Sequence, residues 1–161
     1  MSRAQELPVV EIFDSIQGEG AWQGTPMSFV RLAGCNVGRY AQLGEKYPKC
    51  VSWNGSTFRC DTDYRSSEIM SVQDIAARAQ LPHVCVTGGE PFVHHYERLV
   101  ELAGELWGCN PDCEIHFETN GTKPLAPFAA FFDEQELSSI WITCSPKLGF
   151  LKENVPFIIE L

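Results

Sequence analysis

Short apolar runs alternate with stretches of helical periodicity along this chain, and this alternation constrains the fold more than any other feature. The expected strands cover residues 28–33, 83–87, 114–118, 140–143 and 157–159. The expected helices cover residues 72–80, 96–107 and 127–132. Strands separated by helices form a parallel sheet with right-handed crossovers. We therefore expect an α/β fold with a mostly parallel sheet, either open or a partial barrel.

Local signals mark the ends of the helices and one exception to the alternation. Ser71 and Asp74 have the pattern of a capping pair at the start of the first helix. Gly108 is expected to end the second helix. Residues 36–59 show no clear period, and we expect them to form a long loop. Loops of that length are usually functional or disordered.

Each group of unusual residues lies just after an expected strand. Cys35 follows the first strand, and Gly88-Gly89-Glu90 follows the second. Thr119-Asn120-Gly121 follows the third, and Ser145-Pro146-Lys147 follows the fourth. Ligands of parallel α/β sheets and barrels bind at the carboxyl ends of the strands. The sequence therefore predicts that these groups form one site at that edge.

Composition excludes several classes of function. The 161 residues suffice for a single domain, residues 1–161, with a full core. A net charge of −9 argues against a nucleic-acid surface. The sequence has no apolar run of about 20 residues, which a membrane span needs, and its first residues lack a signal pattern. We expect a cytoplasmic protein, and seven cysteines in a reducing compartment favour metal binding or chemistry over disulfides.

Three cysteines lie in one stretch of the sequence. Fourteen residues separate Cys35 from Cys50, and nine separate Cys50 from Cys60. This spacing alone is equally compatible with a core thiol at Cys35 and two incidental loop cysteines. Three thiolates can also hold three irons of a 4Fe-4S cluster and leave the fourth iron open for a chelating ligand. The downstream glycine pair, where backbone can approach a ligand closely, favours the cluster and chemistry on S-adenosylmethionine.

The remaining cysteines and histidines are assigned structural roles. Cys85 and Cys144 lie in apolar strands and are expected to be buried core thiols. Cys109 and Cys113 lack further ligands nearby and are assigned to a surface loop. His94 and His95 are expected to be solvated at the start of a helix.

A series of motifs resembles one known family over almost the whole chain. The motifs are Glu11-Ile12-Phe13, Ile16-Gln17-Gly18-Glu19-Gly20, Phe29-Val30-Arg31-Leu32-Ala33-Gly34-Cys35-Asn36, Cys60-Asp61-Thr62-Asp63, Thr87-Gly88-Gly89-Glu90-Pro91, Glu118-Thr119-Asn120-Gly121 and Ser145-Pro146-Lys147. In order and rough spacing the chain resembles the 7-carboxy-7-deazaguanine synthase family of radical S-adenosylmethionine enzymes. The resemblance implies a partial (β/α) barrel of the radical SAM type.

The resemblance also implies an activity. Such a lyase converts 6-carboxy-5,6,7,8-tetrahydropterin to 7-carboxy-7-deazaguanine with loss of ammonia, in queuosine and other 7-deazapurine biosynthesis. It uses a 4Fe-4S cluster, S-adenosylmethionine and Mg²⁺, and a reductant such as flavodoxin or ferredoxin. A homodimer is implied, and neither nucleic acid nor a membrane is an expected partner.

Matching motifs imply roles for individual residues. Substrate contacts would come from Ile16, Gln17, Gly18, Arg31 and Thr87. Contacts to S-adenosylmethionine would come from Gly89, Ser145, Pro146 and Lys147. Cys35, Cys50 and Cys60 would ligate the cluster, and Thr62 would ligate Mg²⁺ through its hydroxyl oxygen. The planar fork of Arg31 suits a substrate carboxylate. Glu19 is either a general acid or base, or a turn residue.

The chain departs from the family in two places. Cys50 and Cys60 are closer together in most relatives, so residues 36–59 are interpreted as a cluster-binding loop with an insertion. Family members usually continue well past the position of Leu161, which makes the sheet appear shortened at the carboxyl end. Two other hypotheses stay open: an activase that installs a glycyl radical on a partner protein, and a truncated relative without catalytic activity.

Overall fold

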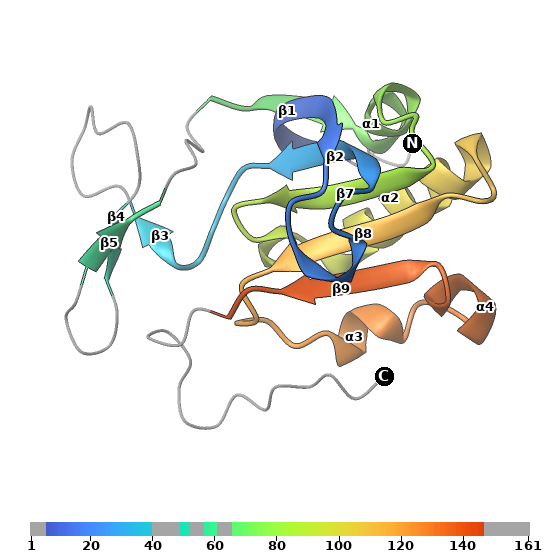
Figure 1. Ribbon diagram of the computed structural model, residues 1–161. Helices are drawn as coiled ribbons and strands as arrows, with labels where there is room; N and C mark the ends of the chain where they lie inside the picture. Colours follow the sequence, from blue (N-terminus) through green and yellow to red (C-terminus); the bar gives the residue numbers. More distant parts are fainter. Residues whose placement is uncertain (1–5, 40–48, 52–56, 61–65, 147–161) are drawn as a thin grey trace.

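A six-stranded sheet forms the centre of the computed structural model, which describes residues 6–39, 49–51, 57–60 and 66–146 (Figure 1). The strand order is β6-β1-β2-β7-β8-β9. The strands are β1 (Glu6–Ile16), β2 (Pro26–Leu32), β6 (Glu68–Ser71), β7 (His83–Gly88), β8 (Glu114–Thr119) and β9 (Ile140–Cys144). Strands β2, β7, β8 and β9 are parallel, and β1 runs antiparallel to both β2 and β6. The expected α/β fold with a mostly parallel sheet is confirmed.

One face of the sheet packs against helices. The described α-helices are α1 (Val72–Arg78), α2 (Tyr96–Cys109), α3 (Ala126–Ala129) and α4 (Glu134–Leu137), and a short 3-10 helix, η2 (Pro91–Val93), follows β7. A second 3-10 helix, η1 (Gly20–Trp22), lies on the opposite face of the sheet. Figure 1 shows α2 behind the sheet. Val30, Val86 and Phe117 from the strands join Ile75 and Leu102 from the helices in one buried apolar cluster. This is the helix-covered face. No described helix has the length and apolar character needed to span a membrane.

The helix boundaries follow the capping signals only in part. The Ser71 hydroxyl accepts the backbone N–H of Asp74 at 3.1 Å, which confirms the predicted cap of α1. The prediction that Gly108 ends the second helix is wrong, because α2 continues to Cys109. The third expected helix covers only Ala126–Ala129, and α4 was not predicted. A capping box formed by Asp133 and Glu136 starts α4.

A second, three-stranded antiparallel sheet lies within the segment expected to be a loop. It contains β3 (Gly38–Arg39), β4 (Lys49–Val51) and β5 (Thr57–Arg59) in the order β3-β4-β5. Figure 1 shows this sheet beyond the carboxyl ends of β2 and β7. The interpretation of residues 36–59 as a loop is therefore wrong for these strands, which are too short to show a period of two. The strand expected at residues 157–159 lies outside the described residues.

An irregularity in β1 determines which side chains reach each face. Val9 pairs with Leu32, but Glu11 pairs with Arg31, so the register shifts between Val9 and Glu11. One extra residue in a strand reverses the alternation of its side chains beyond that point. Glu11 therefore lies on the same face as its partner Arg31, opposite the helices. Phe13, which pairs with Phe29, also lies on that face.

Candidate functional site

The loops after the four parallel strands meet at one edge of the sheet. The backbone N–H of Gly89, after β7, donates to the Leu32 carbonyl of β2 at 3.1 Å. The N–H of Glu90 donates to the Gly34 carbonyl at 2.9 Å. The N–H of Ser145, after β9, donates to the Thr119 carbonyl of β8 at 2.8 Å. The predicted convergence at the carboxyl ends of the strands is confirmed.

The Gly88-Gly89 pair is needed because the chain passes very close to itself there. Gly88 has a φ of +119°, and a Cβ at this position would lie 2.2 Å from the Leu32 carbonyl oxygen. A Cβ on Gly89 would lie 1.7 Å from the Gly34 carbonyl oxygen. Both contacts are with backbone and cannot be relieved by a rotamer change. Packing of the chain therefore requires both glycines, and contact of Gly89 with S-adenosylmethionine stays a prediction.

A fully buried carboxylate connects the ends of β7 and β8. Glu90 accepts three hydrogen bonds, from the Phe92 N–H at 3.2 Å, the Thr119 hydroxyl at 2.8 Å and the Asn120 N–H at 2.6 Å. Burial raises the pKa of the Glu90 carboxyl, and these hydrogen bonds together with Lys123 oppose the rise. Glu90 thus fixes the Thr119–Asn120 turn relative to the glycine pair.

The Asn120 side chain extends this network to the first predicted cluster cysteine. Its Nδ2 lies 3.1 Å from Asn36 Oδ1 and 3.9 Å from Cys35 Sγ. The backbone N–H of Val37 also points to Cys35 Sγ, at 3.4 Å. Two N–H groups are thus directed at one sulfur, and hydrogen bonds to the ligand sulfurs are a regular feature of iron–sulfur sites. The surroundings of Cys35 therefore fit the role of a cluster ligand.

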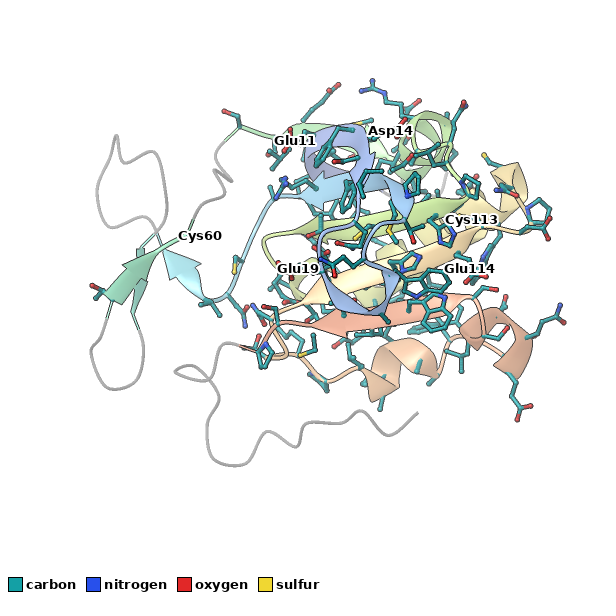
Figure 2. The ribbon with its side chains drawn as sticks, in the orientation of Figure 1. Glu11, Asp14, Glu19, Cys60, Cys113 and Glu114 are labelled. Carbon is teal, nitrogen blue, oxygen red and sulfur yellow. The ribbon has the colours of Figure 1, made fainter. Side chains whose placement is uncertain are left out.

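The other predicted metal ligands are only partly described. Cys50 belongs to β4, and its side chain lies outside the described set. Cys60 follows β5 and is partly buried, and Figure 2 places it by the small sheet. Thr62 and Lys147 lie outside the described residues. Within the described ranges, no three Cys, His, Asp or Glu side chains are grouped closely enough to hold a metal ion. The cysteine trio stays a prediction.

A line of polar side chains crosses the face opposite the helices, just below the loops. We call Glu11, Arg31, Thr87 and Glu118 the rim row. Glu11 pairs with Arg31 across β1 and β2, and Arg31 pairs with Thr87 across β2 and β7. The Thr87 hydroxyl donates to Glu118 Oε2 at 2.6 Å. Four adjacent strands thus place alternating acidic and donor groups side by side.

The loop between β1 and β2 adds a further donor to the rim row. Gln17 is buried, and its Nε2 donates to Glu118 Oε1 at 3.0 Å. Both Gln17 and Thr87, two of the predicted substrate residues, therefore meet at Glu118. Sequence reasoning assigned no role to Glu118, although it lies in a quoted motif and two positions beyond His116 on the same face of β8.

An aromatic row lies beneath the rim row. Phe13, Phe29, Cys85, His116 and Trp141 are successive cross-strand partners from β1 to β9. Trp22 of η1 covers this row, with its ring 5.4 Å from the His116 ring and 4.9 Å from the Trp141 ring. The rows resemble the layers of side chains that fill a (β/α) barrel. The aromatic row gives the polar groups above it an apolar floor.

Two histidines take part in this apolar floor. His83 Nδ1 and His116 Nε2 are 3.1 Å apart. Burial, with a smaller effect of His83, lowers the pKa of His116 to about 4. His116 is therefore neutral near pH 7.

Several smaller expectations are corrected. His95 is exposed as expected, whereas His94 is only partly exposed: its Nε2 lies 2.8 Å from the Ala33 carbonyl oxygen, and burial lowers its pKa. Cys144 is only partly buried, whereas Cys85 is fully buried as expected. Cys113, assigned to a surface loop, is buried immediately before β8.

The remaining predicted site residues are exposed around this site. Ile16 is the last residue of β1, Gly18 lies in the loop between β1 and β2, and Ser145 and Pro146 follow β9. Glu19 is exposed on the same loop, in front of the sheet in Figure 2, and its backbone N–H donates to Gln17 Oε1 at 3.0 Å. The described contacts of Glu19 are those of a turn residue.

Known proteins resemble this chain over most of its length, although no protein-family model matches it. A 7-carboxy-7-deazaguanine synthase of Pyrobaculum aerophilum is 35% identical over 161 aligned positions, which cover 98% of this chain and 62% of the relative. The synthase of Bacteroides thetaiotaomicron is 35% identical, with 86% of this chain and 60% of the relative covered. The chain thus spans about three fifths of the length of these curated relatives.

A solved structure agrees with the sequence relatives. The crystal structure of QueE from Escherichia coli superposes with a TM-score of 0.59 at 27% sequence identity. The superposition covers 90% of this chain and 61% of that chain.

Proposed function

Because the chain belongs to the 7-carboxy-7-deazaguanine synthase family, we propose that it carries out the reaction for which that family is named. The substrate would be 6-carboxy-5,6,7,8-tetrahydropterin, and the products 7-carboxy-7-deazaguanine and ammonia. The reaction would serve the biosynthesis of queuosine and other 7-deazapurines. The proposal also includes a cytoplasmic homodimer and a flavodoxin or ferredoxin as reductant.

The rim row is the observation that carries the substrate assignment. A carboxy-tetrahydropterin has a carboxylate at one end and a flat ring with N–H donors at the other. Arg31 offers the planar fork that a carboxylate prefers, while Glu118 offers acceptor oxygens for ring N–H groups. Gln17 and Thr87 already hold both oxygens of Glu118 in place. The row thus has complementary groups for both ends of the ligand.

The cofactor residues of the proposal surround the rim row. Cys35, Cys50 and Cys60 would hold the 4Fe-4S cluster, and the two N–H donors at Cys35 Sγ support this role. When bound, the cluster and S-adenosylmethionine would supply the radical chemistry. Gly89, Ser145, Pro146 and Lys147 would contact S-adenosylmethionine, and Thr62 would ligate Mg²⁺. Ile16, Gln17 and Gly18 would cover the substrate from the loop between β1 and β2.

Anaerobic reconstitution of the full chain tests the proposal. Near four irons and four sulfides should bind each chain, and incubation with S-adenosylmethionine, Mg²⁺, reductant and the carboxy-tetrahydropterin should form the deazapurine. A reconstituted protein that cleaves S-adenosylmethionine but leaves the pterin unchanged would contradict the substrate assignment. Such a result would favour a different radical reaction, such as glycyl-radical installation on a protein.

A further inference from the structure

Arg31 is held from one side by a second residue of the rim row. Its Nε donates a hydrogen bond of 2.8 Å to Glu11 Oε1, and the two side chains form an ion pair. Arg31 of β2 and Glu11 of β1 are direct cross-strand partners. Its guanidinium carbon lies 5.5 Å from the centre of the Phe13 ring. Phe13 in turn stacks on Phe29, with ring centres 5.3 Å apart and an angle of 11°. Glu11 thus holds one edge of the guanidinium, and Phe13 packs near it.

The other edge of the same guanidinium is available. Among the described residues, the terminal nitrogens Nη1 and Nη2 of Arg31 make no hydrogen bond or ion pair. The side chain is 26% exposed, so part of it can be reached by a ligand. An arginine held through Nε can still bind a carboxylate through its two terminal nitrogens.

The register shift in β1 explains how Glu11 reaches this position. Without the extra residue after Val9, Glu11 would lie on the helix-covered face with Val9. β-bulges are common next to active sites because they redirect side chains. Glu11 is also 52% exposed, so the pair contributes little to folding. A shift that brings an exposed carboxylate to a ligand-facing arginine is better explained by binding than by stability.

We propose that Glu11 is a positioning residue, which orients Arg31 so that its terminal nitrogens receive the carboxylate of the substrate. This inference rests on the proposed function, because it concerns the carboxylate of the same pterin. Glu11 acts through Arg31 and does not touch the ligand. It also neutralises Arg31, so its benefit comes from orientation, while its negative charge opposes the incoming carboxylate.

Binding of two pterins to the anaerobically reconstituted chain tests this role. The probes are 6-carboxy-5,6,7,8-tetrahydropterin and 5,6,7,8-tetrahydropterin, which lacks the carboxyl group, measured by calorimetry. Glu11→Ala should weaken binding of the carboxylated pterin about tenfold, since a hydrogen bond that orients a charged group is lost. It should leave binding of tetrahydropterin unchanged. Glu11→Gln keeps an oxygen acceptor for Nε and should bind the carboxylated pterin at least as well as the wild type.

A double-mutant cycle separates action through Arg31 from a direct effect. In an Arg31→Ala background, Glu11→Ala should cause no further loss of affinity. Both single variants should melt within about 2 °C of the wild type, because the pair is exposed.

Each other result overturns the inference in a recognisable way. If Glu11→Ala weakens both pterins equally, or lowers the melting temperature markedly, then Glu11 is a structural residue. If Ala and Gln both tighten binding of the carboxylated pterin, then Glu11 only competes with it. If neither changes that binding, Glu11 has no role in it. A wild-type chain that binds neither pterin overturns the proposed function itself, and the inference with it.

Discussion

The two faces of the central sheet use the same strands for different purposes. On the helix-covered face, Val30, Val86 and Phe117 pack into one apolar cluster with α1 and α2. On the opposite face, Arg31, Thr87 and Glu118 from the same strands form the polar rim row. Burial of apolar area stabilises the first face. The second face holds partly exposed polar groups in hydrogen bonds that constrain their geometry, so changes there should affect binding more than folding.

The largest effect on folding is expected in the helix-covered face. Leu102 of α2 is fully buried in the apolar cluster, and Leu102→Ala should lower the free energy of unfolding by about 2–5 kcal/mol through lost burial and a cavity. Urea denaturation measures the change. The exposed neighbour Glu101 provides the control, since Glu101→Ala should change stability by less than about 0.5 kcal/mol. Equal effects of the two variants on stability would contradict the view that the apolar cluster of the helix-covered face stabilises the fold.

The next largest effect is expected at Glu90, where folding and site geometry meet. Glu90→Gln replaces an acceptor oxygen with an amide donor, which must face one of three N–H or O–H donors. Loss of that bond in a buried position should lower the free energy of unfolding by about 1–3 kcal/mol. Glu97→Gln, on the exposed side of α2, is the matched control and should have no measurable effect. An unchanged Glu90→Gln variant would mean that this network does not stabilise the edge.

A change at Glu118 should affect ligand binding more than the stability of the fold. Glu118→Gln keeps one acceptor oxygen for the Gln17 amide, and the Thr87 hydroxyl, unlike a backbone N–H, can turn to accept from the new amide group. The free energy of unfolding should therefore change by less than about 1 kcal/mol. The affinity for the carboxy-tetrahydropterin should nevertheless fall about 10–100-fold, because a charged acceptor is lost. Calorimetry and urea denaturation of the same preparation measure both quantities. A variant that unfolds easily yet binds normally would reverse the assignment of this face.

A smaller, pH-dependent effect is expected from the aromatic row. Because the pKa of His116 falls to about 4 in the folded state, the unfolded chain binds an extra proton at intermediate pH. The contribution of neutral His116 to the free energy of unfolding is therefore fully present above its ordinary pKa of 6.5. This contribution is lost as the pH falls from there towards about 4. Between pH 7 and pH 5, the wild type should lose about 2 kcal/mol more than His116→Phe. If the free energy of unfolding changes with pH in the same way for both proteins, then the pKa of His116 does not differ between the folded and unfolded states.

The smallest expected effect is a difference in reactivity between two thiols, Cys85 and Cys109. Burial in the aromatic row raises the pKa of Cys85, whereas Cys109 is exposed at the end of α2. In the native metal-free protein, iodoacetamide should alkylate Cys109 and leave Cys85 intact, because the thiolate is the reactive form. Peptide mass spectrometry measures the two sites. Early modification of Cys85 would indicate that the aromatic row opens easily.

The sequence predicted those parts of the fold whose signals are local. Apolar runs marked β2, β7, β8 and β9, and the Ser71–Asp74 pair marked the start of α1. Strand β1 was missed, because its register shift interrupts the alternation of side chains. Strands β3 to β5 have only two or three residues and carry no readable period.

The same distinction applies to the site. Cys35, Gly89 and Thr87 could be selected because they lie in short motifs beside strand ends. Glu118 was missed, because its partners Thr87 and Gln17 are 31 and 101 residues away in sequence. The role inferred for Glu11 depends likewise on a cross-strand pair created by the bulge. Motifs identify candidates, whereas pairing between distant strands decides which of them meet.

A crystal structure of the anaerobically reconstituted chain with bound carboxy-tetrahydropterin tests the account most directly. We expect the ligand on the face opposite the helices, with its carboxylate at the terminal nitrogens of Arg31 and its ring N–H groups at Glu118. Density for the pterin elsewhere, with Arg31 and Glu118 in contact only with protein, would contradict the claim that one face of the sheet stabilises the fold and the other binds the ligand.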